Sequence, residues 1–248
     1  MTEYAVYKDL LHVSPNGEYP GKIAIGIPQV LDWFTTQPLW NNLPYHILVM
    51  ENLGPDLGKL FKQHKRPFST KTVLMLADQI LQRIKFLHEE GYIHRDIKPG
   101  NFLMGLGMWE NTVYLADFGL SKKNDAIYKE NAGFTGTPKY ASMNTHLGIS
   151  QSRRDDMESI GYVLILFRSG CLPWQNLKQY EKMIKMKKRT TVENVCRECE
   201  VEFHMYLRYC RGLRFDEEPD YNYLRKLFND LFYRLEHQYD WIFDWTTI

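Results

Sequence analysis

The sequence predicts an α+β fold in which a short, sheet-bearing portion precedes a larger helical portion. Residues 1–58 are interrupted by prolines and glycines and contain one β-rich run, Tyr45–Met50. From Ser69 onward, apolar residues recur at three- and four-residue steps, which is typical of amphipathic helices. Of the 248 residues, 44% are hydrophobic and 25% are charged, a composition that favours a globular protein and excludes a disordered or fibrous one.

The elements can be predicted in chain order. Ser69 can cap the first long helix. Two strand-like pieces follow, at 92–94 and 113–116, and each leads into an acidic residue in a turn. The stretch 157–167 leaves little polar surface, as expected of a central helix surrounded by protein. Residues 224–235 have the pattern of a further amphipathic helix.

The charge and the apolar runs exclude several classes of partner. Lysine and arginine number 31 and aspartate and glutamate 30, which leaves a formal charge of +1. With no global field to hold a nucleic acid or an anionic membrane, we expect neither as a partner. The longest apolar run, 159–167, is much shorter than the ~20 residues of a membrane span. No basic segment followed by a long apolar one opens the sequence, so we expect a cytoplasmic or nuclear protein.

The four cysteines are Cys171, Cys196, Cys199 and Cys210, too few for a disulfide framework in a chain of this length. Three of them, with His204, come within one residue of a zinc-knuckle spacing. Bulky side chains crowd the interval between His204 and Cys210, which favours a packed helix over a metal-wrapped loop. We therefore expect reduced thiols and a core helix, with a zinc site as the weaker alternative.

A basic cluster precedes these cysteines. It consists of Lys182, Lys185, Lys187, Lys188 and Arg189. Such a cluster can be a nuclear address or a phosphate-docking surface. More often it is the solvated face of a helix, which is the interpretation we favour.

The residues that carry chemistry lie around the two strand-like pieces. Residues 92–101 read YIHRDIKPGN, and Asp117-Phe118-Gly119 follows the second piece. In order and separation, the two segments match the catalytic loop and the magnesium-binding triplet of protein kinases. Either motif alone is common by chance, but the two together are not.

The chemistry explains the residue types. An acceptor hydroxyl needs a carboxylate that orients it and receives its proton, the role expected of Asp96. A neighbouring cation, Lys98, stabilises the transferring phosphoryl group. Magnesium needs hard oxygen ligands, which Asn101 and Asp117 supply from two neighbouring turns. The predicted catalytic residues are therefore Asp96, Lys98 and Asn101, and the predicted metal ligands are Asn101 and Asp117.

Beyond these motifs, the chain resembles the casein kinase I family of serine/threonine kinases from about residue 45 to the end. Ser142-Met143-Asn144 stands where most kinases carry Ala-Pro-Glu, a substitution typical of this family. The segments that carry the resemblance are 54–57, 96–105, 136–149, 151–159, 172–174, 209–215 and 239–245.

The resemblance implies a protein-kinase-like bilobal fold. A truncated small N-lobe would occupy residues 1–51, a hinge 52–55 and a mainly helical C-lobe 56–248. It also implies that the cofactors are ATP and Mg²⁺ and that the acceptors are serine and threonine hydroxyls of proteins.

The resemblance also assigns roles around the nucleotide. Met50 would lie at the back of the adenine pocket, the backbone of Glu51 to Leu53 would bind the base, and Leu103 would form the floor. Asp156 matches the buried aspartate that opens the central helix and holds the catalytic-loop backbone. Since a carboxylate at a helix start also suits a capping role, a helix cap is a compatible interpretation of Asp156.

Two parts of the kinase pattern are not found in the sequence: a Gly-x-Gly-x-x-Gly strand, and a lysine in a Val-Ala-Ile-Lys setting that holds the ATP phosphates. Gly105-Leu106-Gly107 follows the catalytic loop and is predicted to be a hairpin turn. Lys22-Ile23-Ala24-Ile25 has the residues in the wrong order. Residues 3–8 look like the segment whose glutamate pairs with the missing lysine, so we expect Glu3 to lack that partner.

Three accounts of this gap stay open: a truncated chain, a degenerate kinase that binds without catalysing, and an enzyme that turns over ATP weakly. Intact Asp96, Lys98, Asn101 and Asp117 favour chemistry, in this chain or in a longer form of it. The leading hypothesis is an ATP-dependent serine/threonine kinase in truncated form. The alternative is a pseudokinase that acts as a binding scaffold.

The family favours acidic or already phosphorylated protein substrates, and Lys139 stands where a basic residue of its anion site is expected. The remainder of that site looks weakened, because residues 175–180 are shorter than the family pattern and Gln179 stands where lysine is expected. The stretch 117–136 is short as well. We expect a monomer with a weak preference for acidic or phosphorylated protein substrates.

Overall fold

The computed structural model describes every residue except 1, 13–24, 37–44, 126 and 247–248. The long helices of this part of the chain all follow residue 69, whereas its strands are short. In chain order the elements are α1 (Glu3–Leu10), β1 (Val30–Thr36), β2 (Tyr45–Met50), α2 (Leu57–His64), α3 (Thr70–Glu89), β3 (Tyr92–Ile93), the 3₁₀ turn η1 (Pro99–Asn101), β4 (Phe102–Met104), the 3₁₀ turn η2 (Gly107–Trp109), β5 (Val113–Leu115), β6 (Lys122–Lys123), α4 (Met143–His146), α5 (Arg153–Ser169), α6 (Tyr180–Arg189), α7 (Val192–Val195), α8 (Val201–Gly212) and α9 (Tyr221–Arg234).

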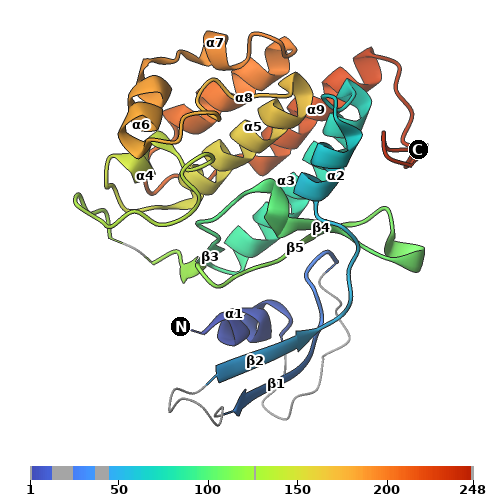
Figure 1. The fold of residues 1–248 in the computed structure, drawn as a ribbon, viewed down its shortest axis with the longest axis vertical. Helices are drawn as coiled ribbons and strands as arrows, with labels where there is room; N and C mark the ends of the chain where they lie inside the picture. The colour runs from blue at the N-terminus through green and yellow to red at the C-terminus, as the bar shows by residue number, and fades with distance from the viewer. Residues whose placement is uncertain (1, 13–24, 37–44, 126, 247–248) are drawn as a thin grey trace.

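The strands pair in three separate antiparallel ribbons, β1–β2, β3–β6 and β4–β5. Figure 1 shows α1 with β1 and β2 at one end of the molecule, the ribbon β4–β5 in the middle and the helices α4 to α9 at the other end. The predicted mixture of α and β structure is confirmed. The lobe boundaries and the hinge at 52–55 stay predictions.

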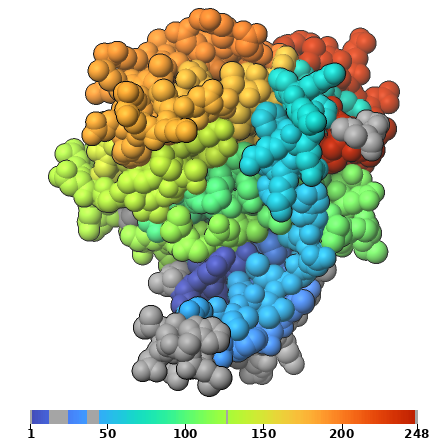
Figure 2. All heavy atoms as spheres, viewed as in Figure 1, coloured from blue at the N-terminus to red at the C-terminus, as the bar shows by residue number. Residues whose placement is uncertain are grey.

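The amino-terminal elements pack through aromatic rings. The ring of Tyr4 on α1 stacks on Trp33 of β1 with centroids 4.7 Å apart, and Trp33 stacks on His46 of β2. In Figure 2 this part lies beneath the larger body as a smaller unit. Of the segment 22–25, only Ile25 lies within the described residues, where it is exposed.

Helices α3, α5, α8 and α9 enclose the main core. α3 begins where predicted, since the Ser69 hydroxyl accepts a hydrogen bond from the backbone N–H of Thr72 at 3.2 Å. α5 is buried from Asp155 to Phe167, which confirms the predicted central helix. α9 buries the apolar stripe that the pattern predicted, including Leu224, Phe228 and Leu231.

The ribbon β4–β5 carries the chain between the two predicted motifs. Gly105-Leu106-Gly107 lies in the connection between its strands, as predicted for a hairpin. The residues before α2 are tied to β4, because Gly54 N donates to the Met104 carbonyl at 2.8 Å and Met104 N donates to the Pro55 carbonyl at 3.1 Å. These bonds place the predicted hinge against the strand that follows the catalytic loop.

The cysteine region is only partly the predicted helix. Cys210 lies within α8, but Cys196 ends α7 and Cys199 precedes α8. The His204 ring nitrogen contacts the Cys196 carbonyl at 3.0 Å. In the described residues no group of three or more histidine, cysteine, aspartate or glutamate side chains could hold a metal ion. All four cysteines are free thiols.

The basic cluster is corrected at one position. Lys182, Lys185, Lys188 and Arg189 are exposed on α6, as expected of a solvated helix face, but Lys187 is buried with 1% of its surface exposed.

No described helix is both long and apolar enough to cross a membrane.

Candidate functional site

Asp96 lies at the centre of the site and is held at both carboxylate oxygens. Lys98 Nζ contacts Oδ2 at 2.5 Å, and the hydroxyl of Thr137 donates to Oδ1 at 2.6 Å. The side-chain amide of Asn101 donates to the Asp96 carbonyl at 2.9 Å. The structure therefore brings together the three predicted catalytic residues, and it adds Thr137.

Asp156 fixes the backbone that presents Asp96. Its two oxygens accept the backbone N–H of His94 at 2.7 Å and of Arg95 at 2.9 Å, and Oδ2 also contacts His88 at 3.0 Å. Burial raises the pKa of the Asp156 carboxyl, but its hydrogen bonds and charge interactions with His88 and His94 together outweigh burial, and the pKa is lowered. The carboxylate thus holds the catalytic-loop backbone, the geometry that the resemblance implies for it.

The backbone at both motifs adopts a rare conformation. Arg95 and Asp117 have left-handed φ values of 69° and 65°, which cost about 1–2 kcal/mol each for residues with a Cβ atom. Arg95 is held in this conformation by Asp156 and by its own side chain, because Nε donates to the Leu120 carbonyl at 2.6 Å. Gly136 passes so close that a Cβ atom there would lie 2.4 Å from the Arg95 carbonyl oxygen. The close approach explains why glycine occupies this position.

Asn101 and Asp117 present oxygens suitable for a hard cation. The Asn101 side-chain N–H donates to the Asp96 carbonyl. Its Oδ1 can therefore accept a hydrogen bond or coordinate a cation. The Asp117 side chain is 52% exposed, and its closest cation is Lys98, 3.8 Å from Oδ2. This donor set of one carboxylate and one amide oxygen fits magnesium.

Glu3 points at the Asp117-Phe118-Gly119 turn. Its carboxylate accepts the Phe118 backbone N–H at 3.0 Å. Burial and the charge of Asp117 raise the pKa of Glu3. In the described part of the chain no ion pair joins Glu3 to a lysine, and the missing lysine partner stays a prediction.

The residues predicted around the adenine base lie near the junction of β2 and β4. Met50 ends β2, and Glu51 next to it accepts the Gln29 backbone N–H at 2.7 Å. Leu103 lies in β4, where it forms a β-bridge with Asp56. Leu53 lies in the stretch between them. An adenine-binding role for these residues stays a prediction.

Lys139 opens onto a cavity of about 540 Å³ beside Lys98, and α2 supplies further cations to it. Burial and the charge of Lys62 lower the pKa of Lys139. Lys62 on α2 is thus a further cation near Lys139, while the weakened anion site expected from the short segment 175–180 stays a prediction. The lysines and amides that line this cavity are Lys59, Lys62, Lys98, Lys139, Gln175 and Asn176.

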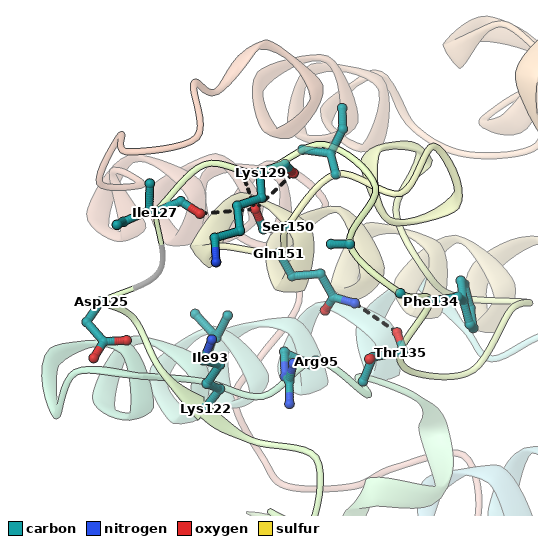
Figure 3. Close-up of a pocket in the computed structure, with 13 residues that line it drawn as sticks. Ile93, Arg95, Lys122, Asp125, Ile127, Lys129, Phe134, Thr135, Ser150 and Gln151 are labelled. Atoms are coloured by element: carbon teal, nitrogen blue, oxygen red, sulfur yellow. Dashed lines mark hydrogen bonds between the residues drawn. The ribbon is translucent and has the colours of Figure 1, made fainter.

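A second cavity, of about 500 Å³, lies beneath the segment that follows the Asp117 turn (Figure 3). Arg95 and Lys122 line one side of it, and the other side is fixed by hydrogen bonds from Ser150 and Gln151. Gln151 donates to the Thr135 carbonyl at 2.8 Å, and the Ser150 hydroxyl contacts the Lys129 carbonyl at 3.1 Å. These bonds tie the described residues of this segment to the stretch before α5.

Sequence reasoning missed two functional contacts. Thr137 lies within a motif that carried the resemblance, but nothing local indicates its bond to Asp96, which is 41 positions away. The sequence predicts Lys187 to be exposed like its basic neighbours. One signal indicates its burial, because Lys187 follows the half-buried Met183 by four positions and so lies on the same face of α6.

A comparison with protein families agrees with this geometry. The family model described as "Protein kinase domain" matches residues 28–224, which is most of the chain. The match extends from just before β1 into α9 and includes Asp96, Asn101 and Asp117, whereas Glu3 precedes it.

Proposed function

The chain belongs to the protein kinase family, and we propose that it is a serine/threonine kinase of the casein kinase I type that phosphorylates acidic or already phosphorylated proteins. The observation that carries the proposal is the arrangement of Asp96, a carboxylate held between Lys98 and Thr137 and backed by Asn101. A carboxylate so oriented can accept a proton from an alcohol without reorganising. The choice of serine and threonine rests on the family resemblance.

In the proposed reaction, the acceptor oxygen bonds to the γ-phosphorus of ATP while the bond from that phosphorus to the β–γ bridging oxygen breaks. The proton of the acceptor hydroxyl passes to the Asp96 carboxylate, and Lys98 lies beside it to stabilise the transferring group. Asn101 and Asp117 would hold magnesium, which neutralises charge on the phosphates when bound. Asp156 keeps Asp96 in register through the backbone of His94 and Arg95.

The proposed substrate preference rests on the cavity next to Lys98. Lys62 and Lys139 are like charges near one another, and a phosphate or carboxylate of an incoming peptide would relieve their repulsion. Lys59 is a weaker contributor, because its ammonium lies 3.6 Å from the Asp56 carboxylate. The cavity therefore supports a modest preference for anionic substrates.

One observation favours a second candidate function, a scaffold that binds proteins without phosphorylating them. Glu3 contacts a backbone N–H of the Asp117 turn, and in the described residues no lysine forms an ion pair with it. Because the sequence contains no lysine in the Val-Ala-Ile-Lys setting that holds the ATP phosphates, this candidate function predicts weak ATP binding. Calorimetric titration with ATP and magnesium tests this expectation, and a dissociation constant in the low micromolar range or below would remove the support for a scaffold.

The kinase proposal is tested by the rate of phosphate transfer from ATP to an acidic serine peptide. Asp96→Asn should lower that rate by about 100-fold or more, because general-base catalysis contributes ~10²–10⁴. Asp216→Asn is the matched control, since Asp216 is an aspartate whose side chain is 82% exposed. A similar rate for Asp96→Asn and the control would refute the assignment of Asp96 as the base.

A further inference from the structure

Lys187 is a buried lysine surrounded by backbone carbonyls. It lies on α6 with 1% of its surface exposed. Its Nζ contacts the Ala141 carbonyl at 2.5 Å and lies 3.4 Å from the carbonyls of Pro138 and Lys139. Three carbonyls of one short segment therefore converge on a single ammonium group.

Aromatic faces complete the site of this cation. Nζ lies 4.6 Å from the ring centroid of Tyr162 and 4.9 Å from that of Trp174, both within the range of cation–π attraction. The Trp174 indole N–H donates to the Lys139 carbonyl at 2.8 Å, so the same ring also holds the segment directly. Lys187 and Trp174 thus contact the segment from α6 and from the stretch after α5.

Other titratable groups also face Lys187. The His146 ring on α4 lies 3.4 Å away, Glu158 on α5 attracts the charge, and Arg211 on α8 repels it. Burial lowers the pKa of Lys187 to about 7, which Glu158 partly opposes, and burial also lowers the pKa of His146 to about 4. Burying a lysine costs free energy, and the three carbonyls and two rings around Lys187 offset part of this cost. These contacts tie the lysine to the segment that supplies the carbonyls.

The segment held by Lys187 contains the residue that contacts Asp96. Residues 137–141 form a tight turn, in which the backbone N–H groups of Tyr140 and Ala141 donate to the Thr137 carbonyl at 2.9 Å and 3.0 Å. Thr137 Oγ1 donates to Asp96 from this turn, and Lys139 lines the cationic cavity from it. The backbone donors thus close the turn on one side, and its Pro138, Lys139 and Ala141 carbonyls face Lys187.

We propose that Lys187 is a positioning residue: it gathers the carbonyls of turn 137–141, so that Thr137 stays bonded to Asp96 and Lys139 stays at the cavity. The effect of Lys187 on catalysis rests on the proposed kinase function. Its effect on the conformation of turn 137–141 does not depend on that function. Lys187 touches no reacting atom and acts through Thr137 and Lys139.

The experiment compares Lys187→Met with wild type in the full chain. Methionine keeps the apolar stem and removes the donors and the charge, and Lys188→Met on the exposed side of the same helix is the matched control. Hydrogen exchange of the Tyr140 and Ala141 amides is measured at about pH 6, below the pKa of Lys187, together with thermal unfolding and peptide kinetics.

We expect the Tyr140 and Ala141 amides to exchange about tenfold faster or more in Lys187→Met, a larger increase than that of the α3 amides, and the unfolding temperature to fall because the carbonyls lose their donor. The KM for peptide should rise and kcat should fall, while the KM for ATP stays constant. A purely global loss of stability would speed exchange of the α3 amides as much as that of the turn, so a larger increase at Tyr140 and Ala141 would support positioning. Unchanged exchange of the two amides would overturn the proposal.

Two further measurements distinguish a failure of the proposed kinase function from a failure of the proposed role of Lys187. If the wild type transfers no phosphate, the kinase function fails, but amide exchange still tests the hold on the turn. If Lys187→Met does not fold, nuclear magnetic resonance of the unmodified chain replaces it. A scalar coupling between the Lys187 ammonium nitrogen and the Ala141 carbonyl would support the proposal, and its absence would overturn it.

Discussion

Thr137 and Asp96 are 41 positions apart in the sequence, and the Thr137 hydroxyl donates to the Asp96 carboxylate at 2.6 Å. Lys98 contacts the other oxygen of the same carboxylate. The catalytic loop and the turn at 137–141 therefore form one site. A carboxylate fixed from both sides is oriented before a substrate arrives, which is the condition for efficient proton transfer.

The hydroxyl of Thr137 should matter for catalysis more than for folding. Thr137→Val keeps the shape of the side chain and removes the donor, and a hydrogen bond to a charged group contributes about 1.5–3 kcal/mol. We expect kcat/KM for peptide phosphorylation to fall about 10- to 100-fold, and Thr137→Ser to restore most of it. Equal rates for the valine variant and the wild type would show that the bond has no catalytic role.

The cationic cavity should set substrate preference to a modest degree. An exposed charge pair contributes about 0.2–1 kcal/mol, so Lys139→Ala and Lys62→Ala should each reduce the preference for a phosphorylated over an unphosphorylated peptide by a few-fold at most. The measurement is peptide phosphorylation at low and high salt, and salt should weaken the preference. Lys188→Ala serves as the control, since this lysine is exposed on α6.

A preference that survives in the double variant of Lys62 and Lys139 would contradict this assignment. An unchanged preference in Lys62→Ala alone would show that Lys62 does not contribute to substrate preference. Of the two lysines, only Lys139 would then contribute.

Asp155 should make stability depend on pH. Burial raises the pKa of this carboxyl to about 7, although hydrogen bonds from Ser142 and the Ser152 backbone oppose the shift. Between pH ~4 and ~7 the folded state then holds a proton that the unfolded state has released, so the free energy of unfolding falls as pH rises through this window.

The slope is at most about 1.4 kcal/mol per pH unit, the value for one proton. Asp155→Asn should remove this contribution, and Asp216→Asn should keep it. Denaturant unfolding of the three proteins at several pH values checks the prediction. Parallel pH dependence in wild type and Asp155→Asn would exclude Asp155 as the source.

Local patterns predicted the parts of the fold that local physics determines. Ser69 marked the start of α3 because a hydroxyl that satisfies a free N–H is favoured there. The apolar stretch at 157–167 predicted a buried helix because such side chains leave no face for water. Asp96, Lys98 and Asn101 lie together because short spacing in one loop keeps them close, and their catalytic roles stay predictions.

The contacts that escaped prediction join distant segments. In the sequence Lys187 resembles its exposed basic neighbours, and only the folded chain brings it to the carbonyls of Pro138, Lys139 and Ala141. Lys62 lies on α2, far in sequence from Lys139. The local residue pattern of either segment could not indicate that the two side chains approach one another. Tertiary packing supplies both relationships.

The most direct measurement of the central claim is mass spectrometry of an acidic serine peptide incubated with the wild-type chain, ATP and magnesium. The account predicts a phosphoserine product that accumulates with time and is reduced about 100-fold or more by Asp96→Asn. Its absence with the wild type, under conditions where ATP binding is demonstrated, would contradict the account.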